Sequence, residues 1–356
     1  MKLFGTFDVR YTQCTAIFRT ITHKITFVVF LLLLYLLPLI AGAQLISLLT
    51  HIAITSITVL GLMILVGYAG QISLGQSAFM AVGAYASGLL ITLCGFPFLL
   101  ALPCAGLAGG LAGLIFGIPS LRLKGFYLAM ATLAASFIIP WIIIWVRPDI
   151  TGGVYPGLTV PPPVIFGFTF NTETSMFYLV ITITLIMIYL AKNITRTRIG
   201  RAFVAIRDND LAAEVLGINI FKYKLMAFFI CSVYAGISGA LWGHWQRALN
   251  PEHFTLMDSV WYLGMVVVGG LGSIMGAIFG AAFIRLLEYF VTAVAPILEG
   301  LLPEGLAGGY AIYIFVGLGA LTFGMSMILF LIFQPRGINH AWRVFLASLR
   351  LHPFSD

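Results

Sequence analysis

The sequence predicts an all-α membrane protein, a polytopic helix bundle with about 8–10 transmembrane helices and with glycine-broken or re-entrant segments. Hydrophobic residues make up 61% of the 356 residues and charged residues only 9%, whereas a soluble domain carries about 25% charge. The apolar runs are close to the length of a membrane-spanning helix, and they are too long for barrel strands. In such a chain the net charge of +7 indicates basic loops beside the membrane, so we expect no nucleic-acid partner.

The expected spans follow one another along the chain, and the two longest connections are a polar, Pro/Gly-rich loop over roughly 147–172 and a basic loop over 192–224. Residues 1–24 are polar and basic, residues 25–333 hold the transmembrane domain, and residues 334–356 form a tail. Apolar runs mark the spans, at residues 25–41, 45–66, 77–94, 98–118, 126–146, 175–191, 225–245, 260–295 and 309–333. The run over 260–295 is long enough for a helical hairpin or for a broken, re-entrant pair. Ala41-Gly42-Ala43 mimics a signal-peptidase site, but a second span follows at once, which favours an uncleaved anchor.

The distribution of basic residues predicts the orientation of the chain. With the N-terminus inside and the spans alternating, the inner segments hold 16 of the 19 Lys and Arg residues. The positive-inside rule then places both termini and the 192–224 loop in the cytoplasm. The outer segments carry acids, namely Asp149, Glu173, Glu252, Asp258, Glu299 and Glu304. These acids are candidates for docking a partner protein, beside the simpler interpretation of a solvated face.

Inside the 192–224 loop, the stretch from Gly200 to Gly217 is patterned like two short helices with charges of both signs. N-cap residue types at 208–210 and the glycine at 217 predict a helix over residues 207–217. Its surface is largely apolar and has no bilayer beside it, so we expect it to dock on a partner, with charge pairs at the rim. The alternative is a segment that lies on the anionic inner leaflet. The candidate docking residues are Arg201, Arg207, Asp208, Asn209, Asp210, Leu211, Ala212, Ala213, Glu214, Leu216 and Gly217.

Glycines interrupt the helical pattern at membrane depth in both halves of the chain, at residues 67–77 and 269–276. Unwound backbone exposes amides and carbonyls, which a membrane protein tolerates only against protein or a watery cavity. Paired interruptions in the two halves indicate a transport path, and the alternative is close helix packing around small residues. The candidate path residues are Gly67, Gly70, Gln71, Ser73, Gly75, Gln76, Ser77, Gly269, Gly270, Gly272 and Ser273.

Few other polar residues fall inside the spans. Arg285 and Glu288 are three apart on one helix, which predicts an internal ion pair with a structural role rather than a substrate contact. His51 lies near a span end and is interpreted as a hydrogen-bonded packing residue. The four cysteines form no CxxC and no Cys/His cluster, so packed thiols are expected rather than a disulfide or a metal site. We find no catalytic constellation and no Walker A motif, so we expect neither an enzyme nor a bound cofactor.

Four stretches together resemble the permease subunits of branched-chain amino acid ABC importers of the LivM type. They are GYAGQISLGQSAFMAVGAYASGLL (67–90), RIGRAFVAIRDNDLAAEVLGINIFKYKLMAF (198–228), VVVGGLGSIMGAIFGAAF (266–283) and FQPRGI (333–338). The resemblance implies the ABC importer permease fold in a bacterial or archaeal inner membrane. It also implies a LivH-type permease paralogue, two cytoplasmic ATPases that bind the ATP, and a periplasmic substrate-binding protein.

The resemblance leaves the substrate open. Related permeases of branched-chain amino acids, urea and short amides share these motifs. A self-sufficient secondary transporter or channel is the alternative from another class, but such a protein would carry coupling carboxylates deep in its spans. Only Glu288 is placed in that way. FQPRGI itself is interpreted as a helix stop with a basic anchor.

Overall fold

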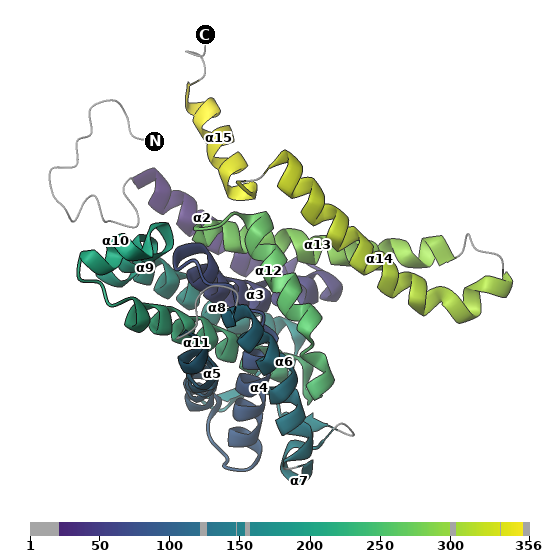
Figure 1. The fold of residues 1–356 in the computed structure, drawn as a ribbon. Coiled ribbons are helices and arrows are strands. Elements are labelled where there is room, and N and C mark those ends of the chain that lie inside the picture. Colours follow the sequence, from purple (N-terminus) through teal and green to yellow (C-terminus); the bar gives the residue numbers. More distant parts are fainter. Residues whose placement is uncertain are drawn as a thin grey trace.

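The computed structural model describes residues 21–121, 127–146, 148–153, 157–299, 304–334 and 336–351, and it is a bundle of helices (Figure 1). Its α-helices are α2 (Ile21–Leu36), α3 (Ala43–Leu62), α4 (Gln76–Thr92), α5 (Phe98–Leu121), α6 (Tyr127–Trp145), α7 (Pro148–Thr151), α8 (Glu173–Arg196), α9 (Arg198–Asp208), α10 (Asp210–Val215), α11 (Ile220–Gln246), α12 (Leu256–Gly269), α13 (Ile274–Glu299), α14 (Glu304–Phe333) and α15 (Ile338–Leu351). Shorter turns are η1 (Leu37–Leu39), the π-helical η2 (Met63–Tyr68) and η3 (Pro251–His253). The only strands in these residues are β1 (Leu158–Thr159), which pairs antiparallel with β4 (Ala248–Leu249), and β2 (Val164–Ile165), which pairs antiparallel with β3 (Phe168–Thr169).

The helices confirm a polytopic membrane bundle. Within the described residues, six helices are long and apolar enough to cross a membrane, or seven if the bent pair of α14 and α15 counts as one span. The predicted span over 77–94 appears as α4, which has 17 residues. The 260–295 run is two helices, and α12 with its 14 residues is about 21 Å long, shorter than the hydrocarbon core.

Several sequence predictions lie outside the described residues. They concern the basic segment up to residue 20, Arg122, Lys124, Arg147 and Pro335, and the side chains of Asp149, Glu299 and Glu304.

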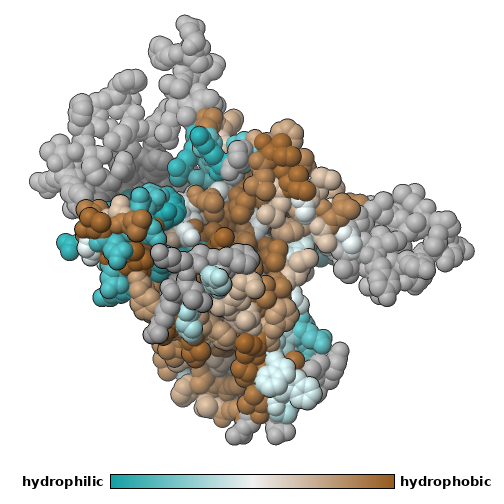
Figure 2. Space-filling view, in the orientation of Figure 1, coloured by the Kyte–Doolittle hydropathy of each residue, from teal (hydrophilic) through white to brown (hydrophobic). Residues whose placement is uncertain are grey.

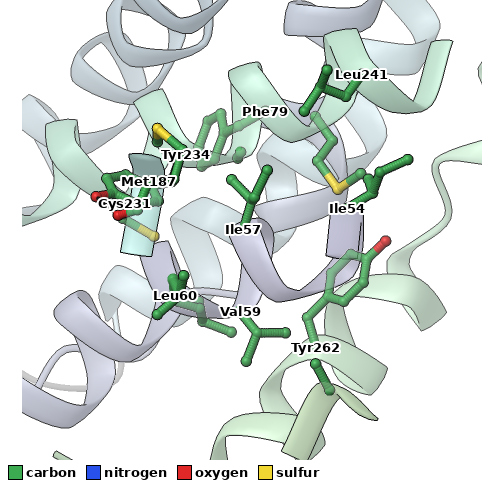
Figure 3. Packing of buried hydrophobic residues seen from close by; sticks show 14 of the residues in the cluster. Ile54, Ile57, Val59, Leu60, Phe79, Met187, Cys231, Tyr234, Leu241 and Tyr262 are labelled. Atoms are coloured by element: carbon green, nitrogen blue, oxygen red, sulfur yellow. Dashed lines mark hydrogen bonds between the residues drawn. The ribbon is translucent and has the colours of Figure 1, made fainter. Parts of the chain in front are cut away.

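The core is built around α3 and α11. Side chains from α3, α4, α8, α11 and α12 meet around α3, with Ile57 and Leu60 among those fully buried (Figure 3). α11 packs closely on α4 and α5 because glycines face it: a Cβ on Gly109 would lie 2.8 Å from the Ser232 carbonyl oxygen. A Cβ on Gly83 would likewise overlap the backbone of Gly236. At these positions small residues serve helix packing, as they often do in membranes.

The bundle has two ends that matter for function. α8 runs from the β-strand loops to α9, and α11 runs back from α10 to β4. The α9–α10 segment therefore lies at one end of these helices, and β1, β4 and α7 lie at the other (Figure 1). We call these the α10 end and the β1 end.

Candidate functional site

The first glycine-broken stretch, residues 67–77, separates α3 from α4, and we call it the first break. The π-helical η2 ends α3, and Gly70 has φ +68°, a left-handed conformation that favours glycine. Helix α6 holds the unwound backbone. The Leu74 amide donates to Thr132 Oγ1 at 2.9 Å, and Ser136 Oγ donates to the Leu74 carbonyl oxygen at 2.9 Å. The break is thus an ordered element that a neighbouring helix supports.

Polar side chains fasten the far end of the first break to other helices. Ser77 donates its amide to Ser259 Oγ of α12 at 3.0 Å, and the two hydroxyl oxygens are hydrogen-bonded at 2.7 Å. Ser259 thereby satisfies an amide at the start of α4 that has no partner within the helix. Gln76 donates to the Thr58 carbonyl oxygen at 3.3 Å and accepts from Cys231 Sγ at 3.2 Å. These predicted path residues therefore lie inside the protein, where they form hydrogen bonds between helices.

Gln71 differs from its neighbours in the first break. Its side chain is 5% exposed, and neither its amide nitrogen nor its amide oxygen has a hydrogen-bond partner among the residues that the structure describes. Ser73, in contrast, accepts the amide of Gly75, which is the N-cap residue of α4. An unsatisfied buried amide costs about 1–3 kcal/mol. The first break therefore contains one polar group that this conformation leaves unsatisfied.

The second glycine-broken stretch, residues 269–276, turns the chain from α12 into α13, and we call it the second break. Gly270 and Gly272 have φ values of +103° and +78°, which L side chains rarely adopt. Ser273 Oγ accepts the Gly276 amide at 3.2 Å and so caps the start of α13. A Cβ on Gly276 would lie 2.6 Å from the Gly269 oxygen, so α12 and α13 leave the turn in close contact. This geometry is a helical hairpin with one short arm.

The two breaks meet each other in space. A Cβ on Gly67 would lie 2.6 Å from the amide nitrogen of Gly272, so the two backbones are in direct contact. Arg207, from the end of α9, lies at the same point. Its Nη1 donates to the Gly67 carbonyl oxygen at 2.7 Å, and a Cβ on Gly272 would lie 3.3 Å from that nitrogen. Gly70 packs on the same side chain, because its Cβ would lie 2.9 Å from Arg207 Cγ. One arginine thus joins both breaks to the α9–α10 segment.

Arg207 was expected at the rim of a docking surface, and the structure gives it contacts within the chain that the sequence did not predict. Besides the Gly67 carbonyl, its Nη2 donates to Asp208 Oδ1 at 2.8 Å, and its Nε donates to the same oxygen at 3.0 Å. The neighbouring carboxylate holds the guanidinium plane while Nη1 reaches the break. Asp208 therefore acts on Arg207, and it does not cap α10.

The rest of the α9–α10 segment follows the predicted pattern. Asn209 Oδ1 accepts the Ala212 amide at 3.0 Å as N-cap of α10. Gly217, with φ +83°, ends the helix, and the Ile218 amide donates to the Ala213 carbonyl oxygen at 3.0 Å. Asp210 lies in the first turn, where its charge suits the helix dipole. The two short helices that the sequence predicted are α9 and α10. The predicted bounds of 207–217 for the second helix were wrong, because Arg207 and Asp208 belong to α9, Asn209 is extended, and α10 is limited to Asp210–Val215.

α10 presents apolar side chains to the surface. Leu211, Val215 and Leu216 are 68%, 88% and 79% exposed. Figure 2 shows hydrophobic atoms at this edge of the molecule beside hydrophilic ones. Arg201, Ala212 and Glu214 are exposed as well. Two large apolar residues on the six residues of α10, together with Leu216 at its C-cap, form an uncovered patch of the kind that marks a protein interface.

Ala213 is a correction to the predicted docking surface. It is 2% exposed and lies on the side of α10 that contacts α9 and α11. A helix with one face against its own protein cannot offer that face to a partner, so Ala213 positions α10 and does not dock.

The C-terminal turn, which sequence analysis interpreted only as a helix stop with an anchor, also touches the second break. A Cβ on Gly270 would lie 2.7 Å from the Arg336 carbonyl oxygen, and Gly337 packs directly against Gly270 with φ +77°. The second break therefore lies between Gly67 with Arg207 on one side and this turn on the other. The glycine of FQPRGI was the one signal for this contact.

At the β1 end, the structure shows a cavity that sequence reasoning missed. It has a volume of about 710 Å³ and lies between the first half of α3, the middle and second half of α13, the start of α8 and the end of α11. Arg285, Glu288 and His51 line it. The predicted ion pair is present: Arg285 Nη1 lies 2.6 Å from Glu288 Oε2. His51 stacks on Trp245, with ring centroids 5.5 Å apart, which confirms a packing role, whereas the expected hydrogen bond of its ring is not found among the described residues.

The predicted acidic face is only partly visible. Asp258 accepts from the Thr255 amide at 2.9 Å and belongs to the capping box of α12, so its charge serves the helix. Glu173 accepts from Trp245 Nε1 at 3.3 Å, and Glu252 is exposed. Among the described residues Cys94, Cys104 and Cys231 are free thiols, and no group of His, Cys, Asp or Glu side chains could hold a metal ion. The prediction of packed thiols holds for the buried Cys231 but is wrong for Cys94, which is exposed in the turn between α4 and α5.

The chain is similar to permease proteins of branched-chain amino acid transport systems. Residues 44–306 match the family described as "Branched-chain amino acid transport system / permease component". The chain is 30% identical over 288 residues to the LivM high-affinity branched-chain amino acid permease protein of Salmonella typhimurium, covering 74% of this chain and 68% of that one. For LivM of Escherichia coli K12 the identity is 33% over 285 residues, with coverages of 74% and 67%. A probable LivH of Methanocaldococcus jannaschii is 26% identical over 277 residues, with coverages of 74% and 81%. No solved structure gave a significant match.

Proposed function

Because this chain belongs to the family of branched-chain amino acid transport permease components, we propose that it is a transmembrane permease subunit of an ATP-driven ABC importer. It forms part of the translocation path for branched-chain or related amino acids. It is not an enzyme, and it binds no cofactor of its own, since the ATP is bound by partner subunits. The two breaks line or gate the path at the α10 end of the bundle.

The contact of Arg207 with both breaks is the observation that carries this proposal. A permease subunit without its own ATPase must receive movement from outside, through an ordered element. α10 is ordered by its Asn209 and Gly217 caps and exposes an apolar patch. Arg207 precedes the first residue of α10 by only three positions. Displacement of a partner seated on α10 would therefore pull on the Gly67 carbonyl and on the backbone around Gly272.

Gln71 supports a gating role for the first break. Its buried amide is unsatisfied in this conformation, so a second arrangement that pairs or hydrates this amide would gain about 1–3 kcal/mol. A difference of this size is enough to bias two states of a gate, each of which can be populated during a transport cycle. The unwound backbone beside it supplies the freedom for such a change.

The partners follow from the family and from the chemistry of the two ends. We place a LivH-type permease paralogue beside this chain in the lipid bilayer, two cytoplasmic ATPases on the α9–α10 segments of the pair, and a periplasmic substrate-binding protein at the β1 end. The basic residues of the 192–224 loop support a cytoplasmic α10 end. The chain would then be a multi-pass protein of the bacterial inner membrane with both termini in the cytoplasm.

Uptake in a deletion strain tests the transport function. We expect the deletion strain to lose uptake of leucine, isoleucine or valine. This gene should restore the uptake, and removal of the partner ATPases should abolish it again. Loss of urea or short-amide uptake instead would assign the chain to a related importer of amides. Uptake that continues without the ATPases would support a self-sufficient secondary transporter or channel and would overturn the proposal.

Cross-linking tests the docking surface. A cysteine in place of Ala212, which is exposed on α10, should form a disulfide-length cross-link to a cysteine in the groove of the ATPase. Ala213→Cys is the matched control, since this neighbouring side chain is buried against α9 and α11. Equal cross-linking of both positions, or of neither, would contradict docking through the exposed face of α10.

A further inference from the structure

The cavity at the β1 end is lined by charged and apolar groups together. Arg285 and Glu288 come from α13, Glu173 from the first turn of α8, and Leu48, Trp245 and Tyr289 add apolar or aromatic surface. Its volume of about 710 Å³ is in the range of small-molecule sites, which run from roughly 300 to 1,000 Å³. Four helices therefore build one chamber with both signs of charge and a place for an apolar group.

The position of the ion pair shows that the chamber cannot face lipid. α13 provides a candidate span over Ile274–Val294, and Arg285 is next to the middle of that range. The Glu288 side chain is 44% exposed, while the Arg285 side chain is 11% exposed. A half-exposed carboxylate at this depth is too costly in hydrocarbon, so ionisable residues there face a water-filled cavity or a protein partner. The face of α13 that bears Glu288 therefore lines an aqueous path, or it contacts another subunit that together with α13 encloses an aqueous path.

The arginine is held ready for an anion. Its Nε donates to Thr55 Oγ1 of α3 at 3.0 Å, and its Nη1 donates to Glu288 Oε2 at 2.6 Å. The Tyr262 hydroxyl of α12 also accepts a hydrogen bond from Arg285. A guanidinium has five N–H donors in a planar fork that matches a carboxylate, and these three bonds leave donors for such a group. Glu288, an acceptor with half of its side chain exposed, offers its remaining lone pairs to an ammonium group.

We propose that this chamber is a binding station for the transported solute and that it selects a zwitterion, an α-amino acid with a free carboxylate and a free ammonium group. Arg285 takes the carboxylate, Glu288 takes the ammonium, and Leu48, Trp245 and Tyr289 border the apolar side chain. This inference rests on the proposed function, because it assumes that the chain lies on an import path. It replaces the purely structural role that the sequence alone assigned to the Arg285–Glu288 pair.

Site-directed labelling in the assembled transporter, reconstituted in proteoliposomes, tests the proposal. Ser47→Cys places a thiol on the chamber wall, with the native cysteines replaced by alanine. A membrane-impermeant methanethiosulfonate reagent should label it, and L-leucine should slow the labelling. The same concentrations of 3-methylbutylamine, which lacks the carboxylate, and of 4-methylpentanoate, which lacks the ammonium, should not. Cys94, exposed in the turn between α4 and α5, is the matched control when it is the only cysteine, and leucine should leave its labelling unchanged.

Two further variants test the charges. Arg285→Gln and Glu288→Gln should each raise the leucine concentration needed for half-maximal protection by about tenfold or more, with Ser47→Cys still accessible. Absence of labelling, protection by the amine or the acid as strong as by leucine, protection by urea, or no effect of either variant would each overturn the zwitterion site. Amino acid uptake by the unlabelled transporter is measured in parallel. Uptake without leucine protection refutes the chamber alone, whereas absence of amino acid uptake refutes the proposed function.

Discussion

Gly67→Ala tests the contact between the two breaks with one added methyl group. The new Cβ would lie 2.6 Å from the Gly272 amide nitrogen and 2.7 Å from Met63 Sδ. The sulfur can rotate away, but the Gly272 backbone cannot. Because Gly67 has no positive φ, the substitution adds no backbone strain, and its effect reports the close contact.

The size of the effect can be worked from these distances. To reach an ordinary 3.4 Å contact, the breaks must separate by about 0.8 Å at this point. A shift of that size along the Arg207 bond would stretch its 2.7 Å hydrogen bond to the limit of such bonds. A hydrogen bond from a charged donor contributes about 1.5–3 kcal/mol, so its loss weakens the link between α9 and the breaks by tenfold or more.

The assay is the amount of amino acid imported per ATP hydrolysed, measured in proteoliposomes that contain the complete transporter. For Gly67→Ala we expect import to fall by about tenfold while hydrolysis continues and the complex stays assembled. Gly324→Ala on α14 is the matched control, because nothing lies within 4 Å of its Cβ position. An unchanged import-to-hydrolysis ratio in Gly67→Ala would refute the idea that the breaks must lie in direct contact.

Three other variants have defined outcomes. Gln71→Leu removes an unsatisfied buried amide, so thermal unfolding of the purified complex should occur at the same or a higher temperature while uptake falls; unchanged uptake would contradict a gating role. Ser259→Ala leaves the amide and hydroxyl of Ser77 unpaired and should lower the free energy of unfolding by about 1–3 kcal/mol, seen as a lower melting temperature than that of wild type. Leu211→Asp with Leu216→Asp should weaken binding of the ATPase by tenfold or more in co-purification and leave the melting temperature of the isolated chain unchanged, since both side chains are exposed; intact co-purification would argue against docking on α10.

The sequence was informative where the signal is local. Asn209 and Gly217 predicted the ends of α10, because capping depends on residues only a few positions apart. Gly70, Gly270 and Gly272 predicted unwound turns, and their positive φ values are of the kind that only glycine adopts freely.

What the sequence could not show is which of these local features touch. Arg207 and Gly67 are 140 positions apart, and an arginine at the end of a basic helix looks like a surface residue until the fold brings a carbonyl oxygen to it. The same limit hid the burial of Ala213, which depends on α9 and α11. The chamber was missed because its lining comes from four helices, although the spacing of Arg285 and Glu288 did predict their ion pair.

The central claim is that the Arg207 side chain carries movement from α10 to both breaks, and substitution of Arg207 tests it most directly. The measurement is the import-to-hydrolysis ratio of the reconstituted transporter with Arg207→Ala, compared with Arg198→Ala, an exposed basic residue at the other end of α9. If Arg207 carries this movement, the Arg207→Ala transporter should assemble and hydrolyse ATP but import about tenfold less amino acid per ATP, whereas Arg198→Ala should behave like the wild type. A wild-type ratio in Arg207→Ala would contradict the account.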